Sequence, residues 1–342
     1  MITVKHVAQA AGVSPGTVSN TLTGKRPVSA KTRARIFQAI EELGYKPNLL
    51  ARSLVNRRSH FIAVITSEID QFGPSRILSG IEAQAEELGY SLLLSLMRDP
   101  SQADVESTIT NLVARGVDGI IWAVHQVGNN RRWFTRERRK KLPPIVFVTM
   151  EPKPGFTIIN SNNRAGAALA VNHLIDTGCR VIGHISGPLD WWEARERLTG
   201  WRQSLAQAGL ENTDDLVARG SWSAESGEAA LHQLLSQRSD IDSIFLGNDQ
   251  MAIGALQAAH RRGYTIPHDL ALVGFDNIPE SRYLWPPLTT IHQGLFEIGK
   301  VALQTAHDAI EYPDEFIARQ ITHQPELIVR ESTGVVHSSG QA

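Results

Sequence analysis

Apolar residues recur every three or four positions in three short runs within the first 44 residues, which is the spacing of amphipathic helices. The first run carries its apolar face on Val4, Val7, Ala8 and Ala11. Thr3 can cap this helix and Gly12 can end it, because glycine adopts the left-handed conformation at little cost. The third run predicts a helix from a Ser29 cap to Leu43, ended by Gly44.

The second run begins almost at once after the first. Ser14 is a favoured N-cap residue and Pro15 fits the first helical position. Val18 and Leu22 would form the inner face, with Val13 between the two helices. Two helices joined by a short glycine-containing turn form a helix-turn-helix, whose second helix meets base edges in the major groove of DNA. An ordinary helical hairpin is the alternative.

From Phe61 onward the apolar runs become strand-like and alternate with helical stretches. The predicted strands are FIAVIT, SLLLSL, GIIWAV and IVFVTM in a first series, then VIGHIS, SIFLG and LALVGF. The predicted helices lie near residues 76–88, 102–115, 165–177, 193–208, 225–236 and 249–262. This alternation predicts parallel sheets covered on both faces, in two lobes. Such sheets bind ligands at the carboxyl ends of their strands, so the cleft between the lobes is the expected site.

Charge divides the chain in the same place as the apolar pattern. Residues 1–60 contain ten Lys and Arg against Glu41 and Glu42, a net charge of +8. The whole chain of 342 residues has a net charge of −1, so the remainder carries −9. A basic end on a near-neutral chain suits contact with phosphates. The length accommodates a small headpiece and a two-lobed core.

Several classes of protein are disfavoured. The single cysteine, Cys179, cannot form a disulfide framework. No apolar run reaches the length of a membrane span, and the headpiece pattern leaves no room for a secretory signal, so we expect a cytoplasmic protein. We find no nucleophile–base pair, zinc spacing or phosphate-binding loop, and His173 or His184 alone is more often structural. We therefore expect no catalytic residues, no metal site and no cofactor.

Three stretches, HVAQAAGVSPGTVSNTLTG, VSAKTRARIFQAIEELGYKPN and ARSL, resemble the headpiece of lactose-repressor-family transcription regulators. The resemblance continues in GPLDWWEARERLTGW, GSWSAESG, FLGNDQMAIGAL, LVGFDN and PPLTTIHQ, which look like the inducer-binding core of that family. It implies an all-α helix-turn-helix headpiece joined to an α/β, two-lobed core with parallel sheets, like that of periplasmic sugar-binding proteins.

The resemblance also implies domain boundaries. The expected parts are a headpiece at residues 1–46, a hinge helix and linker at 47–60, a core at 61–334 and a tail at 335–342. Within the core, lobe 1 would comprise residues 61–160 and 293–320, and lobe 2 residues 161–292 and 321–334. The core would bind the effector and dimerise.

The hinge segment begins where Pro47 forbids helix at Lys46. The residues that follow are compatible with a helix too short to be stable alone. By resemblance this hinge folds when two subunits lie side by side on DNA, and Leu54 is wedged into the minor groove. Arg52 belongs to the same expected contact set. A flexible linker whose leucine packs on the core is the alternative.

The family's base-reading positions fall on Pro15, Gly16 and Asn20, and Asn20 stands where arginine is common. Because asparagine pairs with adenine through two hydrogen bonds, we expect an adenine opposite Asn20 and relaxed preference elsewhere. The side chains expected at phosphates, which set register and not sequence, are Ser14, Thr17, Ser19, Ser29, Thr32 and Asn48.

Carbohydrate binding needs polar groups that reach vicinal hydroxyls and an aromatic face for the sugar ring. The resemblance places Arg197, Asn248 and Asp276 on sugar hydroxyls and Trp222 against the ring. It places Gln293 at the lobe junction, and Ser67, Gln71 and Ile77 on the facing side. Taken singly, Trp222 could be core and Arg197 a surface charge.

The chain also departs from the family pattern. Thr149 occupies a ligand-contacting position that is an aspartate in the resembled core, which puts the sugar's identity in doubt. Trp191 and Trp192 enlarge the aromatic content beside the cleft. Asp249 is expected to cap the helix that follows it and not to touch ligand. The basic run RRWFTRERRKK is expected to form a solvated helix on lobe 1, with a second nucleic-acid contact as the alternative.

The favoured hypothesis is a repressor of carbohydrate-utilisation genes, bound as a homodimer to a palindromic operator and released by a sugar or sugar derivative. Dimer contacts are expected from the first core helix and the LWPPLTTI segment. The absence of leucine heptads after Arg330 favours a dimer. The alternatives are a corepressor-dependent regulator that responds to a non-sugar molecule, as purine-responding relatives do, a solute-binding protein, or an enzyme.

Overall fold

The computed structural model describes residues 2–23, 26–45, 58–97, 105–128 and 130–334. The chain divides into two compact units between Ser59 and His60. Three predicted DNA contacts, Asn48, Arg52 and Leu54, lie outside the described residues.

The described residues of the N-terminal unit form three helices, α1 (Val4–Ala10), α2 (Pro15–Thr23) and α3 (Ala30–Leu43). Its core is formed by Val7, Ala8, Ala11, Val18, Ile36, Ala39 and Tyr45, with Val4, Val13 and Leu22 packed against them. The predicted inner faces are therefore confirmed. Both later caps are also confirmed, since Ser14 Oγ accepts from Thr17 N (3.1 Å) and Ser29 Oγ accepts from Thr32 N (3.3 Å).

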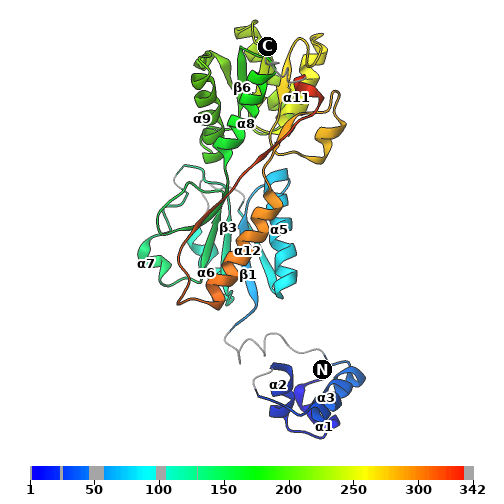
Figure 1. Cartoon of the computed structure of the whole chain (residues 1–342). Coiled ribbons are helices and arrows are strands. Elements are labelled where there is room, and N and C mark those ends of the chain that lie inside the picture. Colours follow the sequence, from blue (N-terminus) through cyan, green and yellow to red (C-terminus); the bar gives the residue numbers. More distant parts are fainter. Residues whose placement is uncertain (1, 24–25, 46–57, 98–104, 129, 335–342) are drawn as a thin grey trace, which may run out of the picture. The chain divides into compact units, whose positions relative to one another are not determined.

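Lobe 1 of the C-terminal unit is built on a parallel six-stranded sheet in the order β11-β5-β4-β3-β1-β2. Its strands are β1 (Phe61–Thr66), β2 (Ser91–Leu96), β3 (Gly119–Ala123), β4 (Ile145–Val148), β5 (Thr157–Ser161) and β11 (Gln320–His323). Helices α5 (Phe72–Leu88) and α12 (Leu295–Glu311) pack on one face and α6 (Val105–Ala114) on the other (Figure 1). Both faces are thus covered, as the uninterrupted apolar strands predict.

Helices α5 and α12 approach each other through glycines. A Cβ atom on Gly80 would overlap the carbonyl oxygen of Phe296, and one on Gly299 would overlap the carbonyl oxygen of Ile77. The missing side chains let the two backbones touch. Helix α12 is absent from the predicted helices, although Leu295, Ile298 and Ala302 recur at helical spacing and are buried.

Lobe 2 is built on a parallel four-stranded sheet in the order β7-β6-β8-β9. Its strands are β6 (Ile182–Ser186), β7 (Val217–Arg219), β8 (Ser243–Leu246) and β9 (Ala271–Val273). Its helices are α8 (Asn163–Asp176), α9 (Trp192–Gln207), α10 (Ala224–Gln237) and α11 (Asp249–Arg261). Trp201, Phe245 and Phe275 are fully buried in one apolar cluster between these layers.

The chain passes between the lobes after β5, after β10 (Thr290–His292) and between β11 and β12 (Glu326–Ile328). Figure 1 shows the last passage as the red segment. The expected boundary at residue 321 is wrong, because Gln320–His323 pairs with β5 in the lobe 1 sheet. The short strands β5, β7 and β10 were not predicted, since three to five residues carry too little apolar pattern.

The prediction of a solvated helix over the basic run is wrong for its first half. Only α7 (Arg136–Arg139) is helical there. Trp133 packs against Trp122 with ring centroids 4.7 Å apart and ring planes tilted by 40°, and this contact carries the neighbouring Arg131 into the interior. Arg131 donates to the Val124 carbonyl and to Asn130 Oδ1 (3.0 Å). Burial lowers its pKa to about 9 against the opposing effect of Glu193.

Within the described ranges no helix is long and apolar enough to cross a bilayer.

Candidate functional site

A pocket of about 60 Å³ lies where the carboxyl ends of both sheets meet. It is lined by eight of the nine predicted effector residues: Gln71, Ile77, Thr149, Arg197, Trp222, Asn248, Asp276 and Gln293. The ninth, Ser67, directly follows β1 and is buried. A larger open groove of about 1040 Å³ lies at the opposite end of the lobe 2 sheet, beside Asp242 and Ala271. None of the predicted effector residues lines that groove, so the pocket between the lobes is the candidate site.

Arg197 is held rigidly in the wall of the pocket. Its Nε donates to Asn163 Oδ1 (2.8 Å) and its Nη1 to the Gly247 carbonyl. The guanidinium lies 3.9 Å from the ring centroid of Phe275 and 5.5 Å from that of Trp222. Burial lowers the pKa of Arg197, although Asp276 opposes that shift. A surface role for Arg197 is thereby excluded, because the side chain is only 6% exposed.

Asp276 lies beside Arg197 at the end of the segment that follows β9. Its Oδ1 accepts from Gln293 Nε2 (2.5 Å) and lies 4.0 Å from Arg197 Nη2. Burial raises the pKa of Asp276 to about 6, while Arg197 and Gln293 limit the shift. The carboxylate is therefore predominantly charged at neutral pH and has an acceptor oxygen available beside a donor. This combination suits a pair of neighbouring hydroxyls.

The expectation that Asp249 caps α11 is wrong. Asn248 is the cap, since its Oδ1 accepts from Met251 N (2.9 Å), and its Nδ2 donates to the Trp222 carbonyl (3.0 Å). Asp249 is fully buried one residue further on. Its Oδ2 accepts from Ile278 N (2.9 Å) and its Oδ1 from Thr290 Oγ1 (2.6 Å). Burial, with Asp276 nearby, raises the pKa of Asp249 to about 8.

Backbone strain is concentrated around the pocket. Three of its lining residues have positive φ, with 58° at Thr149, 70° at Trp222 and 114° at Asp276. Non-glycine residues rarely adopt this conformation, and the cost is of order 1–3 kcal/mol each. Such strain persists only where the surrounding fold enforces it, and it clusters at ligand sites.

Several polar atoms at the pocket are buried without a partner in the described part of the chain. They are Ser67 Oγ, Ser161 Oγ, Trp222 Nε1 and Glu193 Oε2. A buried polar atom that makes no hydrogen bond costs about 1–3 kcal/mol, so these atoms are the places where a ligand would gain most.

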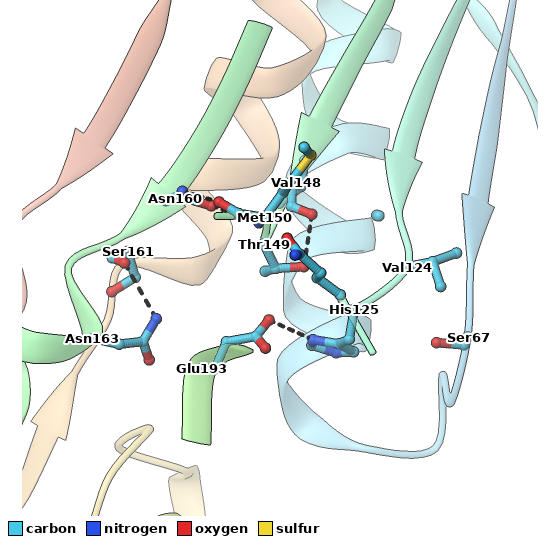
Figure 2. A network of polar contacts seen from close by, with 12 residues as sticks. Ser67, Val124, His125, Val148, Thr149, Met150, Asn160, Ser161, Asn163 and Glu193 are labelled. Atoms are coloured by element: carbon cyan, nitrogen blue, oxygen red, sulfur yellow. Dashed lines mark hydrogen bonds and ion pairs between the residues drawn. The ribbon is translucent and has the colours of Figure 1, made fainter. Parts of the chain in front are cut away.

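Ten lining residues were not assigned to the site from the sequence, and six of them carry polar or aromatic side chains: His125, Ser161, Asn163, Trp191, Trp192 and Glu193. His125 Nδ1 donates to Glu193 Oε1 (2.8 Å), and Figure 2 shows Glu193 facing His125 with Thr149, Ser161 and Asn163 around it. The His125 ring also packs against Trp191, with centroids 4.4 Å apart and ring planes tilted by 32°. The two tryptophans were noticed as aromatic residues beside the cleft, but no spacing in the sequence relates His125 to Glu193.

The headpiece presents the other set of predicted contacts. Pro15 and Gly16 are exposed at the start of α2, and Asn20 is half-buried about one turn further along. Ser14 and Thr17 share a hydroxyl–hydroxyl hydrogen bond (2.9 Å), as do Ser29 and Thr32 (2.9 Å). These two pairs lie at the N-termini of α2 and α3, where backbone N–H groups favour anions such as phosphates.

Two family models match the chain. Bacterial regulatory proteins of the lacI family match residues 3–48, and the periplasmic binding protein-like domain matches residues 171–333. The HTH-type transcriptional repressor PurR of Mannheimia succiniciproducens is 34% identical over 97% of this chain and 98% of its own length. The ribose operon repressor of Escherichia coli K12 is 35% identical over 92% of this chain and 94% of its own length.

Two solved structures extend the likeness. The lac repressor dimer bound to operator and the anti-inducer ONPF superposes with a TM-score of 0.86 at 30% identity, over 97% of this chain and 99% of that chain. A complex of the transcriptional regulator CelR with cellobiose gives 0.72 at 29% identity, over 97% of this chain and 100% of that chain.

A helix-turn-helix headpiece on a periplasmic-binding-protein-like core defines an effector-responsive, DNA-binding transcriptional regulator. The chain belongs to the lacI family of bacterial regulatory proteins. Its relatives are transcriptional repressors and not enzymes, in keeping with the expectation from the sequence.

Proposed function

We propose that the effector of this regulator is a saccharide or sugar derivative, and that its binding releases the chain from its operator. The observation that carries this proposal is the convergence of Arg197, Asp276 and Gln293 beside the Trp222 ring. A planar donor fork, a carboxylate and an aromatic face are the groups that a sugar ring with vicinal hydroxyls requires. The solved CelR complex contains cellobiose, which agrees with a pocket of this kind.

In this proposal the sugar's apolar face lies on Trp222. Arg197 donates to ring hydroxyls, Asp276 accepts from them, and Asn248 contributes its remaining lone pair. Ser67, Gln71 and Ile77 face the ligand from lobe 1.

The small size of the pocket links binding to movement. Sites that enclose small ligands typically have volumes of about 300–1,000 Å³, and this pocket has about 60 Å³. A sugar can therefore enter only if the lobes separate or rearrange. A ligand that prefers one lobe arrangement shifts the equilibrium by its difference in affinity for the two, and that shift is passed to DNA binding.

We further propose a homodimer in the cytoplasm on a palindromic operator, with dimer contacts from α5 and the LWPPLTTI segment. Tyr283 and Trp285, in or directly before that segment, are 80% and 82% exposed. Leu94 and Leu96 on the edge strand β2 are 45% and 51% exposed. Large apolar side chains exposed in this way mark protein interfaces. The dimeric assembly of the similar lac repressor supports a second copy as the occupant.

For DNA recognition we propose that Asn20 reads adenine, and that the serine and threonine pairs at the starts of α2 and α3 contact phosphates. Selection of operators from a random pool should return adenine opposite Asn20, whereas enrichment of guanine there would reject this assignment.

The effector proposal is tested by thermal unfolding with mono- and disaccharides, including ribose, cellobiose and lactose, because a specific ligand raises the melting temperature by mass action. The expected result is a concentration-dependent rise for one sugar and weakened operator binding with the same sugar. A flat response to all saccharides, with a shift from a purine, would reject the sugar assignment.

A corepressor-dependent regulator is the second candidate. It is favoured by the similarity to a PurR repressor and by the edge-to-face pair of Trp191 and Trp222 (5.7 Å), which could hold a planar ring. The direction in which the effector changes operator affinity decides between the two candidates, since a corepressor strengthens operator binding and an inducer weakens it.

A further inference from the structure

Glu193 occupies an unusual position at the boundary of the two lobes. It lies in the first turn of α9 in lobe 2, lines the pocket and is only 5% exposed. Its Oε1 accepts from His125 Nδ1 of lobe 1 (2.8 Å). Its Oε2 is buried and has no hydrogen-bond partner among the residues described.

The carboxylate is charged despite this burial. Burial alone would raise the pKa of Glu193, but His125, the helix backbone and Arg197 together lower it. The favourable position at the N-terminus of a helix acts in the same direction. A buried carboxylate that is charged and half-satisfied requires a donor at its second oxygen.

Neighbouring contacts hold this carboxylate at the seam between the lobes. Trp192 N donates to the Gln126 carbonyl (3.2 Å), and Val127 forms a bridge with Trp191. Gly128 N donates to the Asp190 carbonyl (3.4 Å). Residues 190–193 of lobe 2 therefore rest on residues 125–128 of lobe 1, with Glu193 on the side of the seam that faces the pocket.

We propose that Glu193 is a ligand-binding and specificity-determining residue that also joins the lobes. Its Oε2 accepts a hydrogen bond from a hydroxyl or amino group of the ligand, while its Oε1 keeps His125. The carboxylate that Thr149 does not supply from lobe 1 is thus supplied by lobe 2. The ligand class is a neutral or amino sugar, because the negative charge of Glu193 disfavours sugar acids and sugar phosphates in a buried site. This inference rests on the proposed saccharide effector.

The main test compares matched sugars on the full chain and on Glu193→Gln. The probes are ribose, cellobiose, glucose, glucosamine, glucuronate and glucose 6-phosphate, each titrated by thermal shift and calorimetry. For wild type we expect binding among the neutral or amino sugars and none among the charged acids. In Glu193→Gln we expect about tenfold weaker binding of the preferred sugar. We also expect a smaller difference in affinity between neutral and acidic sugars, because the neutral amide no longer repels anions.

Glu196→Gln is the matched control, since Glu196 lies on the same helix but pairs with Arg164 (3.0 Å) at the outer surface. It should leave both affinity and selectivity unchanged. Equal sugar binding and equal selectivity in wild type and Glu193→Gln would overturn the inference and leave the proposed function intact. A flat response to every saccharide would instead overturn the proposed function, and with it the inferred ligand class.

The link between the lobes is tested without ligand by a double-mutant cycle. His125→Asn and Glu193→Gln should each lower the melting temperature, and the double variant should melt close to the less stable single variant. Additive losses would show that the two side chains do not act as a pair, which would overturn the joining role.

Discussion

The two lobes contribute different chemistry to the same pocket. Lobe 2 supplies charged and amide side chains that are already tied to their own lobe or to the crossing segment, chiefly Arg197, Asp276 and Asn248. Lobe 1 supplies small hydroxyls at Ser67, Thr149 and Ser161 and the Gln71 amide, together with apolar side chains. The charged groups of lobe 2 are therefore already removed from water before the ligand binds, so their desolvation does not weaken binding. Lobe 1 mainly encloses the ligand.

This contrast has a consequence for regulation. Because lobe 2 holds its groups in place, ligand recognition does not depend on closure, whereas enclosure by lobe 1 does. The His125–Glu193 pair is the exception, since it places a charged hydrogen bond across the seam. The contrast predicts that substitutions of polar residues in lobe 2 change effector affinity and folding stability together. Substitutions in lobe 1 should act mainly by changing the packing of its helices and strands.

The largest expected effect is that of Arg197→Met. Loss of the guanidinium removes the positive charge beside the buried Asp276 and the donor to Asn163 Oδ1, which should destabilise the fold by about 3 kcal/mol and abolish measurable effector binding. Urea unfolding and ligand calorimetry measure both. The control is Arg202→Met, because Arg202 lies on α9 with Arg197 and forms an exposed ion pair with Asp214 beyond the end of that helix; its loss should cost under about 1 kcal/mol. Equal losses in the two variants would contradict the role assigned to lobe 2.

Next in size is a packing change in lobe 1. Gly80→Ala forces α5 away from α12 and should cost about 2 kcal/mol, with ligand selectivity retained by the folded protein. Gly73→Ala on the same helix is the control, because a Cβ atom there meets nothing within 4 Å. Its stability should stay level or rise by up to about 1 kcal/mol. Thermal unfolding distinguishes the two, and an intact melting temperature in Gly80→Ala would disprove the close contact.

A pH effect follows from Asp249. Its folded pKa of about 8 lies above the ordinary value of 3.8, so the folded state binds the proton more tightly. Between these values the group lowers stability as pH rises, and most of the loss occurs below pH 8. Asp249→Asn should flatten this slope in urea unfolding measured from pH 5 to 9. The control is Asp269→Asn, because the Thr265 hydrogen bonds lower the pKa of Asp269 and its contribution disappears only at acid pH.

The smallest effect is expected at Thr149. Its φ of 58° is unfavourable for a β-branched residue, and asparagine adopts this region more readily. Thr149→Asn should therefore raise stability by about 0.5–1 kcal/mol, in contrast to the polar substitutions in lobe 2. Thr110→Asn, on the surface of α6, serves as a control and should give no gain. A loss at Thr149 would indicate that its hydroxyl matters more than its backbone.

Local pattern was sufficient for much of the fold. The helix boundaries at Ser14, Ser29 and Gly44 depend on contacts with residues at most a few positions away. They can therefore be predicted from the sequence alone. Strands β1 and β2 follow their apolar runs residue for residue. Family resemblance then located eight of the nine predicted effector residues in one pocket.

Other features depended on contacts that no local pattern records. Asn248 and Asp249 are both good helix caps, and only the burial of Asp249 against Ile278 and Thr290 decides which of them acts. The burial of Arg131 follows from the packing of Trp133 on Trp122. The place of β11 in the lobe 1 sheet follows from its pairing with β5.

Sequence by itself therefore determined the headpiece, the alternation of strands and helices, and the residue types available at the strand ends. These depend on short-range hydrogen bonding and on the period of apolar positions. Tertiary structure alone decided which polar atoms are satisfied and which are left facing the pocket. His125 and Glu193 meet only because two separate sheets bring their strand ends together, and the electrostatics of a buried pair depend on that meeting.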